Sequence, residues 1–273
     1  MDLSQVKLVI SDMDGTLLNH KDQVSDRFFE LFKELQAHDI PFVAASGRQY
    51  YSIVSKLAPI KDDIFVIAEN GGITVKGEEV LDTCTIDTET VHKLIRRMRD
   101  IEDAHIVLCG REQAYVESNH DEFLEIFKEY YTKYKNVEDL TAITEDSFFK
   151  IAVYSFGGSE ETTYPRVRDI EDEVKVKVSG ENWLDISHLD TDKGRALKLL
   201  QQKLNISKDQ TMAFGDYNND LEMIEQAAFS FAMQNAHPNV AKAANYSTKS
   251  NIENGVEHIL EQLVAIKNQL HTK

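Results

Sequence analysis

Two aspartates one position apart follow the first apolar segment of the chain, in the stretch LVISDMDGTLL at residues 8–18. Asp12 and Asp14 carry like charges, and such a pair is costly unless a cation, a shared proton or water lies between the carboxylates. An aspartate can attack phosphorus as a nucleophile, and a neighbouring carboxyl group can donate and then accept a proton. Taken alone, Asp-x-Asp-Gly is equally typical of a turn in which carboxylates accept backbone hydrogen bonds.

Further polar residues follow two other apolar segments, and one more opens an amphipathic segment. They are Ser46, Gly47 and Arg48 at the end of PFVAAS, Asp216, Asn219 and Asp220 at the end of TMAFGD, and Lys193 before GRALKLLQQKL. The carboxyl ends of parallel strands meet at one edge of a sheet, where α/β proteins bind their ligands. We therefore expect all of these side chains at one rim.

The residue types expected at this rim suit phosphate chemistry. Mg²⁺ prefers a site with a few carboxylates, waters and a phosphate oxygen. A hydroxyl, a backbone N–H and a lysine are groups that bind a phosphoryl group and offset its charge. A calcium loop of the EF-hand type does not fit, because Gly15 stands fourth from Asp12 and that loop needs glycine at its sixth position.

The elements that must position these residues alternate between strand and helix. Apolar strands are expected at residues 7–11, 41–46, 63–70, 211–216 and 229–233, and helices at 25–39, 49–57, 194–204, 220–227 and 256–270. Strands that are apolar throughout and alternate with helices indicate a parallel sheet covered on both faces. We predict an α/β fold with a doubly wound, mainly parallel, Rossmann-like core sheet, built from residues 1–83 and 189–273.

Residues 84–188 have a different pattern and are predicted to form an inserted α+β cap domain. Several strands alternate in the manner of half-exposed antiparallel strands. The expected strands are 105–110, 113–118, 148–156, 174–179 and 183–187, and helices are expected at 88–101, at 121–134 and between 156 and 174. Cys84 and Cys109 form no CxxC motif and are predicted to be reduced and partly buried.

Charge and composition narrow the classes of partner. The 273 residues carry 47 acidic and 30 basic side chains, a net charge of −17, which disfavours nucleic acid and anionic membranes as partners. No segment approaches the roughly 20 apolar residues that span a bilayer. The first residues lack the pattern of a signal peptide, which favours a cytoplasmic location. A small anionic partner stays open, since a bound cation reverses the charge of one pocket. The oligomeric state is not indicated.

Four ordered motifs resemble those of the haloacid dehalogenase superfamily, and most closely its Cof-type phosphatases. They are DMDGTLL at 12–18, SGR at 46–48, DKGRAL at 192–197 and GDYNND at 215–220. The predicted insertion also falls where this subfamily carries its α/β cap. The resemblance implies a phosphomonoester hydrolase that uses Mg²⁺ and an aspartyl-phosphate intermediate. It implies a small phosphorylated substrate, such as a sugar phosphate, a nucleotide-like phosphate or a phosphorylated cofactor.

The resemblance also implies a role for each motif residue. Asp12 would be the nucleophile and a Mg²⁺ ligand, and Asp14 the general acid and base, binding Mg²⁺ through its backbone carbonyl. Asp216 would complete the metal site, with Asp220 behind it. The remaining residues would bind phosphate or substrate or support the first loop: Ser46, the Gly47 amide, Arg48, Lys193 and Asn219 for binding, and Thr16 for support.

Departures from the family pattern are small. Ser46 stands where many relatives have threonine, and Asp192 stands where relatives often have a neutral residue; we expect Asp192 to face solvent. Because both Asp12 and Asp14 are present, hydrolysis is favoured over dehalogenation. A phosphomutase or phosphotransferase would use the same aspartyl-phosphate and stays the alternative. A non-enzymatic phosphate sensor is disfavoured by the chain length and the insertion.

Overall fold

The computed structural model describes residues 2–271, which group into two compact units. The first unit is formed by three segments, one ending at Ser46, one from Ile53 to Leu81, and one beginning at Asp192. The second unit comprises Asp82–Thr191 together with the short segment Gly47–Ser52. Each unit has a sheet and an apolar core of its own.

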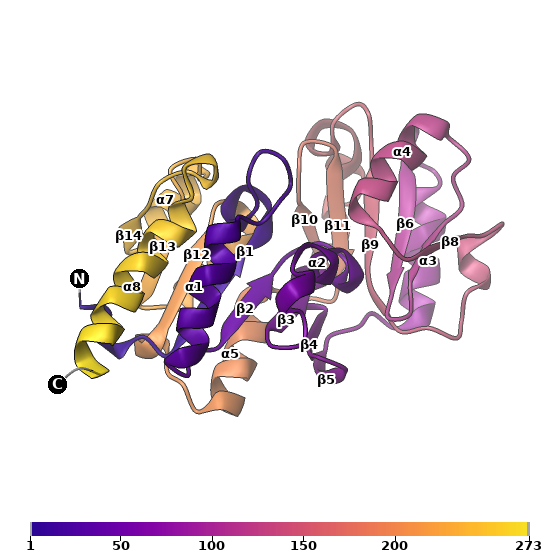
Figure 1. The fold of residues 1–273 in the computed structure, drawn as a ribbon. Coiled ribbons are helices and arrows are strands. Elements are labelled where there is room, and N and C mark those ends of the chain that lie inside the picture. Colours follow the sequence, from indigo (N-terminus) through magenta and orange to yellow (C-terminus); the bar gives the residue numbers. More distant parts are fainter. Residues whose placement is uncertain (1, 272–273) are drawn as a thin grey trace. The chain divides into compact units, whose positions relative to one another are not determined.

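The first unit is built on a sheet with the strand order β14-β13-β12-β1-β2-β3-β4-β5, to which both ends of the chain contribute (Figure 1). The strands are β1 (Leu8–Asp12), β2 (Phe42–Ala45), β3 (Phe65–Ala68), β4 (Ile73–Lys76), β5 (Glu79–Thr83), β12 (Thr211–Gly215), β13 (Phe229–Ala232) and β14 (Tyr246–Ser247). Neighbours from β14 to β3 run parallel, and β3 pairs antiparallel with β4. The predicted doubly wound, mainly parallel sheet is confirmed.

Helices cover both faces of this sheet. They are α1 (Asp26–Ala37), α2 (Tyr50–Lys56), α5 (Lys193–Leu204), α6 (Leu221–Glu225), α7 (Pro238–Ala243) and α8 (Gly255–His271). The predicted cap Ser25 accepts a hydrogen bond from the backbone N–H of Phe28 at the start of α1. α1 packs beside α8, and its Phe28 ring lies 4.9 Å from that of Phe42. The next residue of β2, Val43, faces the core formed with α5, α6 and α7.

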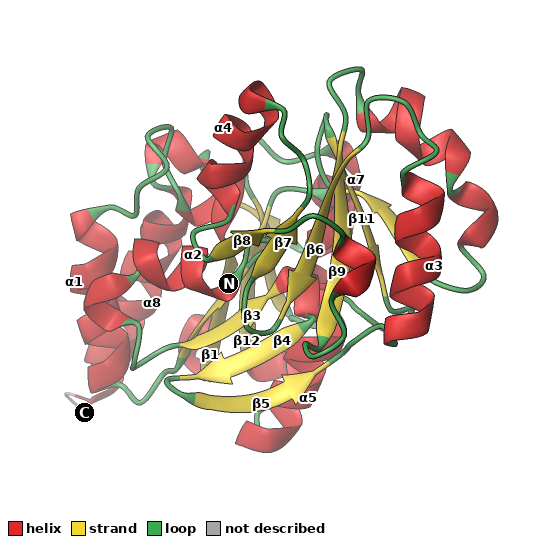
Figure 2. Ribbon diagram, turned by 90° about the vertical axis from the view of Figure 1, so that its right-hand side faces the viewer, coloured by secondary structure: helices red, strands yellow, loops and turns green. Residues whose placement is uncertain are grey.

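The second unit contains a six-stranded sheet in the order β10-β11-β9-β6-β7-β8 (Figure 2). Its elements are α3 (Thr88–Met98), β6 (His105–Gly110), β7 (Ala114–Val116), α4 (Asp121–Tyr130), β8 (Tyr134–Asn136), β9 (Phe148–Tyr154), β10 (Lys175–Val178) and β11 (Trp183–Ser187). All described pairs are antiparallel except β7 with β8. The antiparallel arrangement was predicted, but half-exposure was wrong for most strands, because β6, β7, β9 and β11 are buried along all or nearly all of their residues. In β9, Ile151 packs in the core with α3 and the next residue Ala152 packs in the core with α4.

The helix expected between residues 156 and 174 does not form as a regular α-helix. The segment contains a five-residue turn at Ser159–Thr163 and short 3₁₀ turns at Tyr164–Arg166 and Arg168–Ile170. Pro165 lies in its middle and lacks the backbone N–H that a continuous helix requires. Hydrophobic spacing alone therefore overestimated the regularity of this segment.

Three smaller findings complete the fold. Cys84 and Cys109 are both buried and form no disulfide, as predicted. The short helix α7 was not predicted, although Pro238 at its first position after His237 is a recognised start signal. Among residues 2–271, no helix is both long and apolar enough to cross a membrane.

Candidate active site

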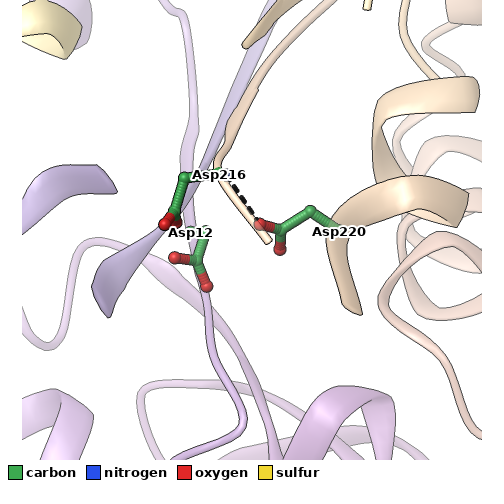
Figure 3. A group of neighbouring side chains, drawn as sticks. All are labelled: Asp12, Asp216 and Asp220. Carbon is green, nitrogen blue, oxygen red and sulfur yellow. Dashed lines mark hydrogen bonds between the residues drawn. The ribbon is translucent and has the colours of Figure 1, made fainter. Parts of the chain in front are cut away.

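Three of the predicted aspartates converge in the first unit. Asp12 ends β1, Asp216 follows β12, and Asp220 directly precedes α6; each contributes one carboxylate oxygen to a group in which these atoms all lie within 4.8 Å of one another. Figure 3 shows the carboxylates of Asp12 and Asp216 close together and Asp220 beside them. Because β1 and β12 are parallel neighbours, their carboxyl ends deliver these acids to one edge, as expected.

The first loop is shaped so that the backbone can approach Asp216. Residues Met13–Leu17 form a tight turn in which Gly15 has φ of +73°, a region that favours glycine. A Cβ at this position would lie 2.3 Å from Asp216 Oδ2. Thr16 Oγ1 donates to Asp216 Oδ1 over 2.8 Å, which agrees with the predicted supporting role of Thr16. Met13, between the two aspartates, is fully buried.

Lys193 is the cation that faces this acidic group. Its Nζ donates to Asp12 Oδ1 over 2.5 Å and to Asp220 Oδ1 over 2.7 Å, and the side chain is fully buried. Asp192 caps the helix that carries it, accepting a hydrogen bond from the backbone N–H of Arg195 over 2.6 Å. The expectation that Asp192 faces solvent was therefore wrong: it is half-buried and fixes the start of α5.

Asp220 is tied to protein groups on both carboxylate oxygens. While Oδ1 accepts from Lys193, Oδ2 accepts from the backbone N–H groups of Asp216 over 2.9 Å and Tyr217 over 3.1 Å. Gly215 makes room for it, because a Cβ there would lie 2.7 Å from the Asp220 side chain. These contacts favour a role for Asp220 in holding Lys193 and the Asp216 loop, rather than in direct metal binding.

The charges of the group do not balance. Three carboxylates face one ammonium group, so two negative charges remain when all are ionised. Burial, with Asp220 as the next cause, raises the pKa of Asp12 well above its usual range and that of Asp216 to about 7. Burial alone would lower the pKa of Lys193, but Asp12 and Asp220 outweigh it and raise this pKa. A divalent cation with oxygen ligands fits the remaining charge and the donor set.

Asp14, Ser46 and Asn219 lie at the edge of the same unit. Asp12 is only 4% exposed, whereas Asp14, two residues later, is exposed. Ser46 Oγ donates to Asp14 Oδ2 at 3.5 Å, a long contact, and the residue itself is buried at the end of β2. Asn219 Nδ2 donates to Asn70 Oδ1 over 3.0 Å. The structure thus places Ser46 beside Asp14 and connects Asn219 to Asn70, two contacts that were not predicted from the sequence. The role of Ser46 in binding phosphate stays a prediction.

Gly47 and Arg48 have contacts within the second unit. The Gly47 carbonyl accepts from Lys150 Nζ over 2.8 Å, and Lys150 is also paired with Asp185 at 3.2 Å. The Arg48 guanidinium lies over the Tyr130 ring, 5.4 Å from its centroid. The roles of Gly47 and Arg48 in binding phosphate or substrate stay predictions. The buried Lys150–Asp185 pair carries no motif by which the sequence could have revealed it.

Comparison with known proteins decides the family. The model of the haloacid dehalogenase-like hydrolases matches residues 9–260, nearly the whole chain. The chain belongs to this family. Among curated relatives, 5-amino-6-(5-phospho-D-ribitylamino)uracil phosphatase YbjI of Escherichia coli is 30% identical over 95% of this chain and 96% of its own. Phosphatase YwpJ of Bacillus subtilis is 27% identical over 95% of this chain and 100% of its own.

Solved structures agree with the assignment of this chain to the haloacid dehalogenase-like hydrolases. The crystal structure of SMU.1108c from Streptococcus mutans is 30% identical, with a TM-score of 0.88 over 95% of this chain and 99% of that one. TM0651 from Thermotoga maritima is 27% identical, with a TM-score of 0.82 over 94% and 97% of the two chains. These comparisons confirm the predicted family and fold. Because the curated relatives are phosphatases, they also confirm the prediction that the chain is a phosphatase.

Proposed function

We propose that the protein is a Mg²⁺-dependent phosphatase of small phosphorylated metabolites that works through an acyl phosphate on Asp12. One observation carries this proposal: Asp12 is buried against Lys193 and two further carboxylates, while Asp14 is exposed beside it. A buried, oriented carboxylate suits a nucleophile. An exposed carboxyl group suits proton exchange with a leaving group and with water.

The acidic group fits a Mg²⁺ ion. Asp12 and Asp216 would bind it through their carboxylates and Asp14 through its backbone carbonyl, with Asp220 supporting Asp216 from behind. When bound, the ion would offset the charge of the carboxylates and of the phosphate that approaches them. The unbalanced charge and the raised pKa values of Asp12 and Asp216 support this assignment.

The reaction would proceed in two displacements at phosphorus. First, a carboxylate oxygen of Asp12 attacks phosphorus and the bond to the ester oxygen breaks, while Asp14 donates a proton to the leaving oxygen. Second, Asp14, now ionised, takes a proton from water as the water oxygen attacks phosphorus. The bond between Asp12 and phosphorus breaks, which regenerates the carboxylate and releases inorganic phosphate.

Lys193 would serve both displacements from a fixed position. Its ammonium group contacts Asp12 and is held by Asp220, so it orients the nucleophile and opposes the negative charge that collects at phosphorus. Ser46, the Gly47 amide and Asn219 would donate hydrogen bonds to the phosphoryl oxygens. Asn219 and Ser46 can do so from the first unit, where Ser46 follows β2, Asn219 follows β12, and β1 lies between these two strands.

For the substrate, the relatives provide the first compounds to test. Three curated relatives, 25–30% identical to this chain, are named as phosphatases of 5-amino-6-(5-phospho-D-ribitylamino)uracil. This compound joins a phosphorylated sugar alcohol to a heterocyclic ring, so it combines two of the substrate classes predicted from the sequence. We propose a small phosphate monoester of this general kind.

The experiment that tests the proposal measures phosphate release from a panel of such esters. The panel contains this uracil derivative, hexose and pentose phosphates, and mononucleotides, with Mg²⁺ or with EDTA. The wild type is compared with Asp12→Asn, which is nearly isosteric. Release that needs Mg²⁺ and is lost in Asp12→Asn supports the proposal. Undiminished release by Asp12→Asn would refute it, and transfer of labelled phosphate to a second hydroxyl would favour the phosphotransferase.

A further inference from the structure

Three consecutive residues after β3 adopt left-handed backbone conformations. The φ angles are +52° at Glu69, +55° at Asn70 and +98° at Gly71. Glycine adopts this region freely and asparagine is enriched in it, but two non-glycine residues in succession are costly. Such strain persists only where the surrounding structure holds it, and it is concentrated at functional sites. The turn therefore calls for an explanation in terms of what it contacts.

Asn70 contacts two of the motifs that supply the predicted phosphate-binding residues. Its backbone N–H donates to the carbonyl of Ser46 over 3.0 Å, and the Ser46 N–H in turn donates to the carbonyl of Ile67 over 2.9 Å. Its side-chain Oδ1 accepts from Asn219 Nδ2 over 3.0 Å. The left-handed φ of Asn70 is what lets one residue use its backbone toward Ser46 and its side chain toward Asn219.

The neighbouring residue places the same turn against a third motif. A Cβ on Gly71 would lie 2.3 Å from the backbone oxygen of Asp192, the residue that precedes Lys193. The turn thus packs closely against the start of α5 in addition to its contacts with Ser46 and Asn219. All four segments belong to the first unit. A displacement of the turn would disturb three motifs together.

The contact with Asn219 has a specific chemical consequence. A side-chain amide has an oxygen that accepts and an NH₂ group that donates two hydrogen bonds. With one N–H bound to Asn70 Oδ1, the amide of Asn219 is fixed in one of its two orientations. The other N–H is then directed away from Asn70 and can serve an anion. In the reversed orientation the amide would present an oxygen, which repels phosphate.

We propose that Asn70 is a positioning residue for the phosphate site, which orients the Asn219 amide so that an N–H faces the phosphoryl group. This rests on the proposed function only in naming phosphate as the ligand. Asn70 acts through Asn219 and through the backbone of Ser46 and takes no part in the proton transfers. Nothing in the four family motifs assigns it such a role.

The test is a double-mutant cycle of Asn70→Gly and Asn219→Ala, with inorganic phosphate as the probe. Glycine accepts the left-handed φ, so the first variant removes the side-chain acceptor and keeps the turn. Phosphate affinity is measured by calorimetry in the presence of Mg²⁺. The matched control is Asn218→Ala, because the neighbouring Asn218 is half-buried, as Asn219 is, and is bound to Asn239 over 3.0 Å instead of to Asn70.

We expect Asn70→Gly to weaken phosphate binding about fivefold, the change that corresponds to one net hydrogen bond. In the Asn219→Ala background, Asn70→Gly should have no further effect, because its partner is already gone. Asn218→Ala should bind as the wild type does. The side-chain NH₂ resonances of Asn219, identified by their loss in Asn219→Ala, should shift in Asn70→Gly and stay in place in Asn218→Ala, without any ligand.

Several results would overturn the proposal. They are unchanged phosphate affinity in Asn70→Gly, an equal loss in both backgrounds, an unshifted Asn219 resonance, or a wild type that does not bind phosphate. None of these measurements requires turnover. If the wild type hydrolyses no ester but the cycle gives the expected coupling, the proposed reaction fails and the role of Asn70 stands.

Discussion

Replacing Asp220 and Asp216 by asparagine should change the stability of the metal-free protein in opposite directions. Asp220 is fully buried, and it accepts from Lys193 on one oxygen and from two backbone N–H groups on the other. Asparagine has a single oxygen, so Asp220→Asn must turn its NH₂ group either toward the ammonium of Lys193 or toward the two backbone donors. Either orientation leaves buried donors facing one another.

The size of this loss follows from the contacts. Asp12 still pairs with Lys193 in this variant, so the cost is that of leaving buried donors unsatisfied, about 1–3 kcal/mol. We therefore expect Asp220→Asn to lose about 1–3 kcal/mol in the free energy of unfolding near neutral pH. The remaining acids relieve part of that loss, because Asp220 is a cause of the raised pKa of both Asp12 and Asp216.

Asp216→Asn removes a charge that the folded state holds unfavourably. The pKa of Asp216 rises from 3.8 to about 7 in the folded protein, first through burial and then through Asp220. Each pKa unit corresponds to about 1.4 kcal/mol. Since Asp216 is half-buried and partly screened by solvent, we expect a gain of roughly 2–4 kcal/mol above pH 7. The amide oxygen of asparagine can still accept from Thr16 Oγ1, which makes this a matched control.

Urea unfolding of the EDTA-treated wild type and both variants, near pH 8, measures the two changes. The expected order of stability is Asp216→Asn, then the wild type, then Asp220→Asn. If Asp220→Asn were as stable as the wild type, its carboxylate would not anchor Lys193 and the Asp216 loop. If Asp216→Asn were the less stable of the two variants, the charge imbalance inferred for this site would be wrong.

Three further predictions follow from the same structure. In the metal-free wild type, Asp12 and Asp216 bind protons more tightly in the folded than in the unfolded state. The melting temperature should therefore fall as the pH rises from about 4 to about 7, and added Mg²⁺ should reverse this fall. Gly15→Ala should lower the free energy of unfolding by roughly 1–3 kcal/mol, because alanine is strained at this positive φ. The added Cβ would also displace Asp216, so metal-dependent turnover should fall by more than the loss of folded protein explains. Lys150→Met should lower the free energy of unfolding, measured in urea, by about 1–3 kcal/mol because the buried carboxylate of Asp185 loses this ammonium partner, and the added change Asp185→Leu should recover part of this loss.

The parts of the fold that were predictable are those that local patterns determine. The cap at Ser25, the apolar face of α1 and the strand that ends in Asp12 each depend on neighbouring residues. The two aspartates, together with their place after a strand, also indicated the edge of the sheet at which the site lies. The prediction of a regular helix between residues 156 and 174 was wrong, because it used only the spacing of hydrophobic residues and Pro165 interrupts the helix.

What could not be predicted depends on contacts between distant segments. Lys193 reaches Asp12 across 181 positions of sequence, and Asn219 reaches Asn70 across 149. No local signal says which oxygen of Asp220 accepts from Lys193 and which from the backbone. The helix cap formed by Asp192 is a local contact. It was not predicted, because relatives often have a neutral residue at this position and Asp192 was expected to face solvent. Asn70 has a left-handed φ, and its two partners, Ser46 and Asn219, lie on other segments of the chain.

In the sequence nothing but position distinguishes Asp12 from Asp14, whereas in the structure Asp12 is buried and Asp14 is exposed. The turn at Gly15 begins between them, so Asp12 stays within β1, buried beside the ammonium of Lys193, while Asp14 emerges at the surface within reach of Ser46. A nucleophile gains from a fixed orientation and from loss of its water shell, whereas a proton donor must exchange its proton between turnovers. Assigning the roles the other way would require the buried carboxylate of Asp12, which is 4% exposed, to exchange protons with water. The geometry of the first loop therefore favours the proposed assignment of Asp12 as the nucleophile and Asp14 as the acid.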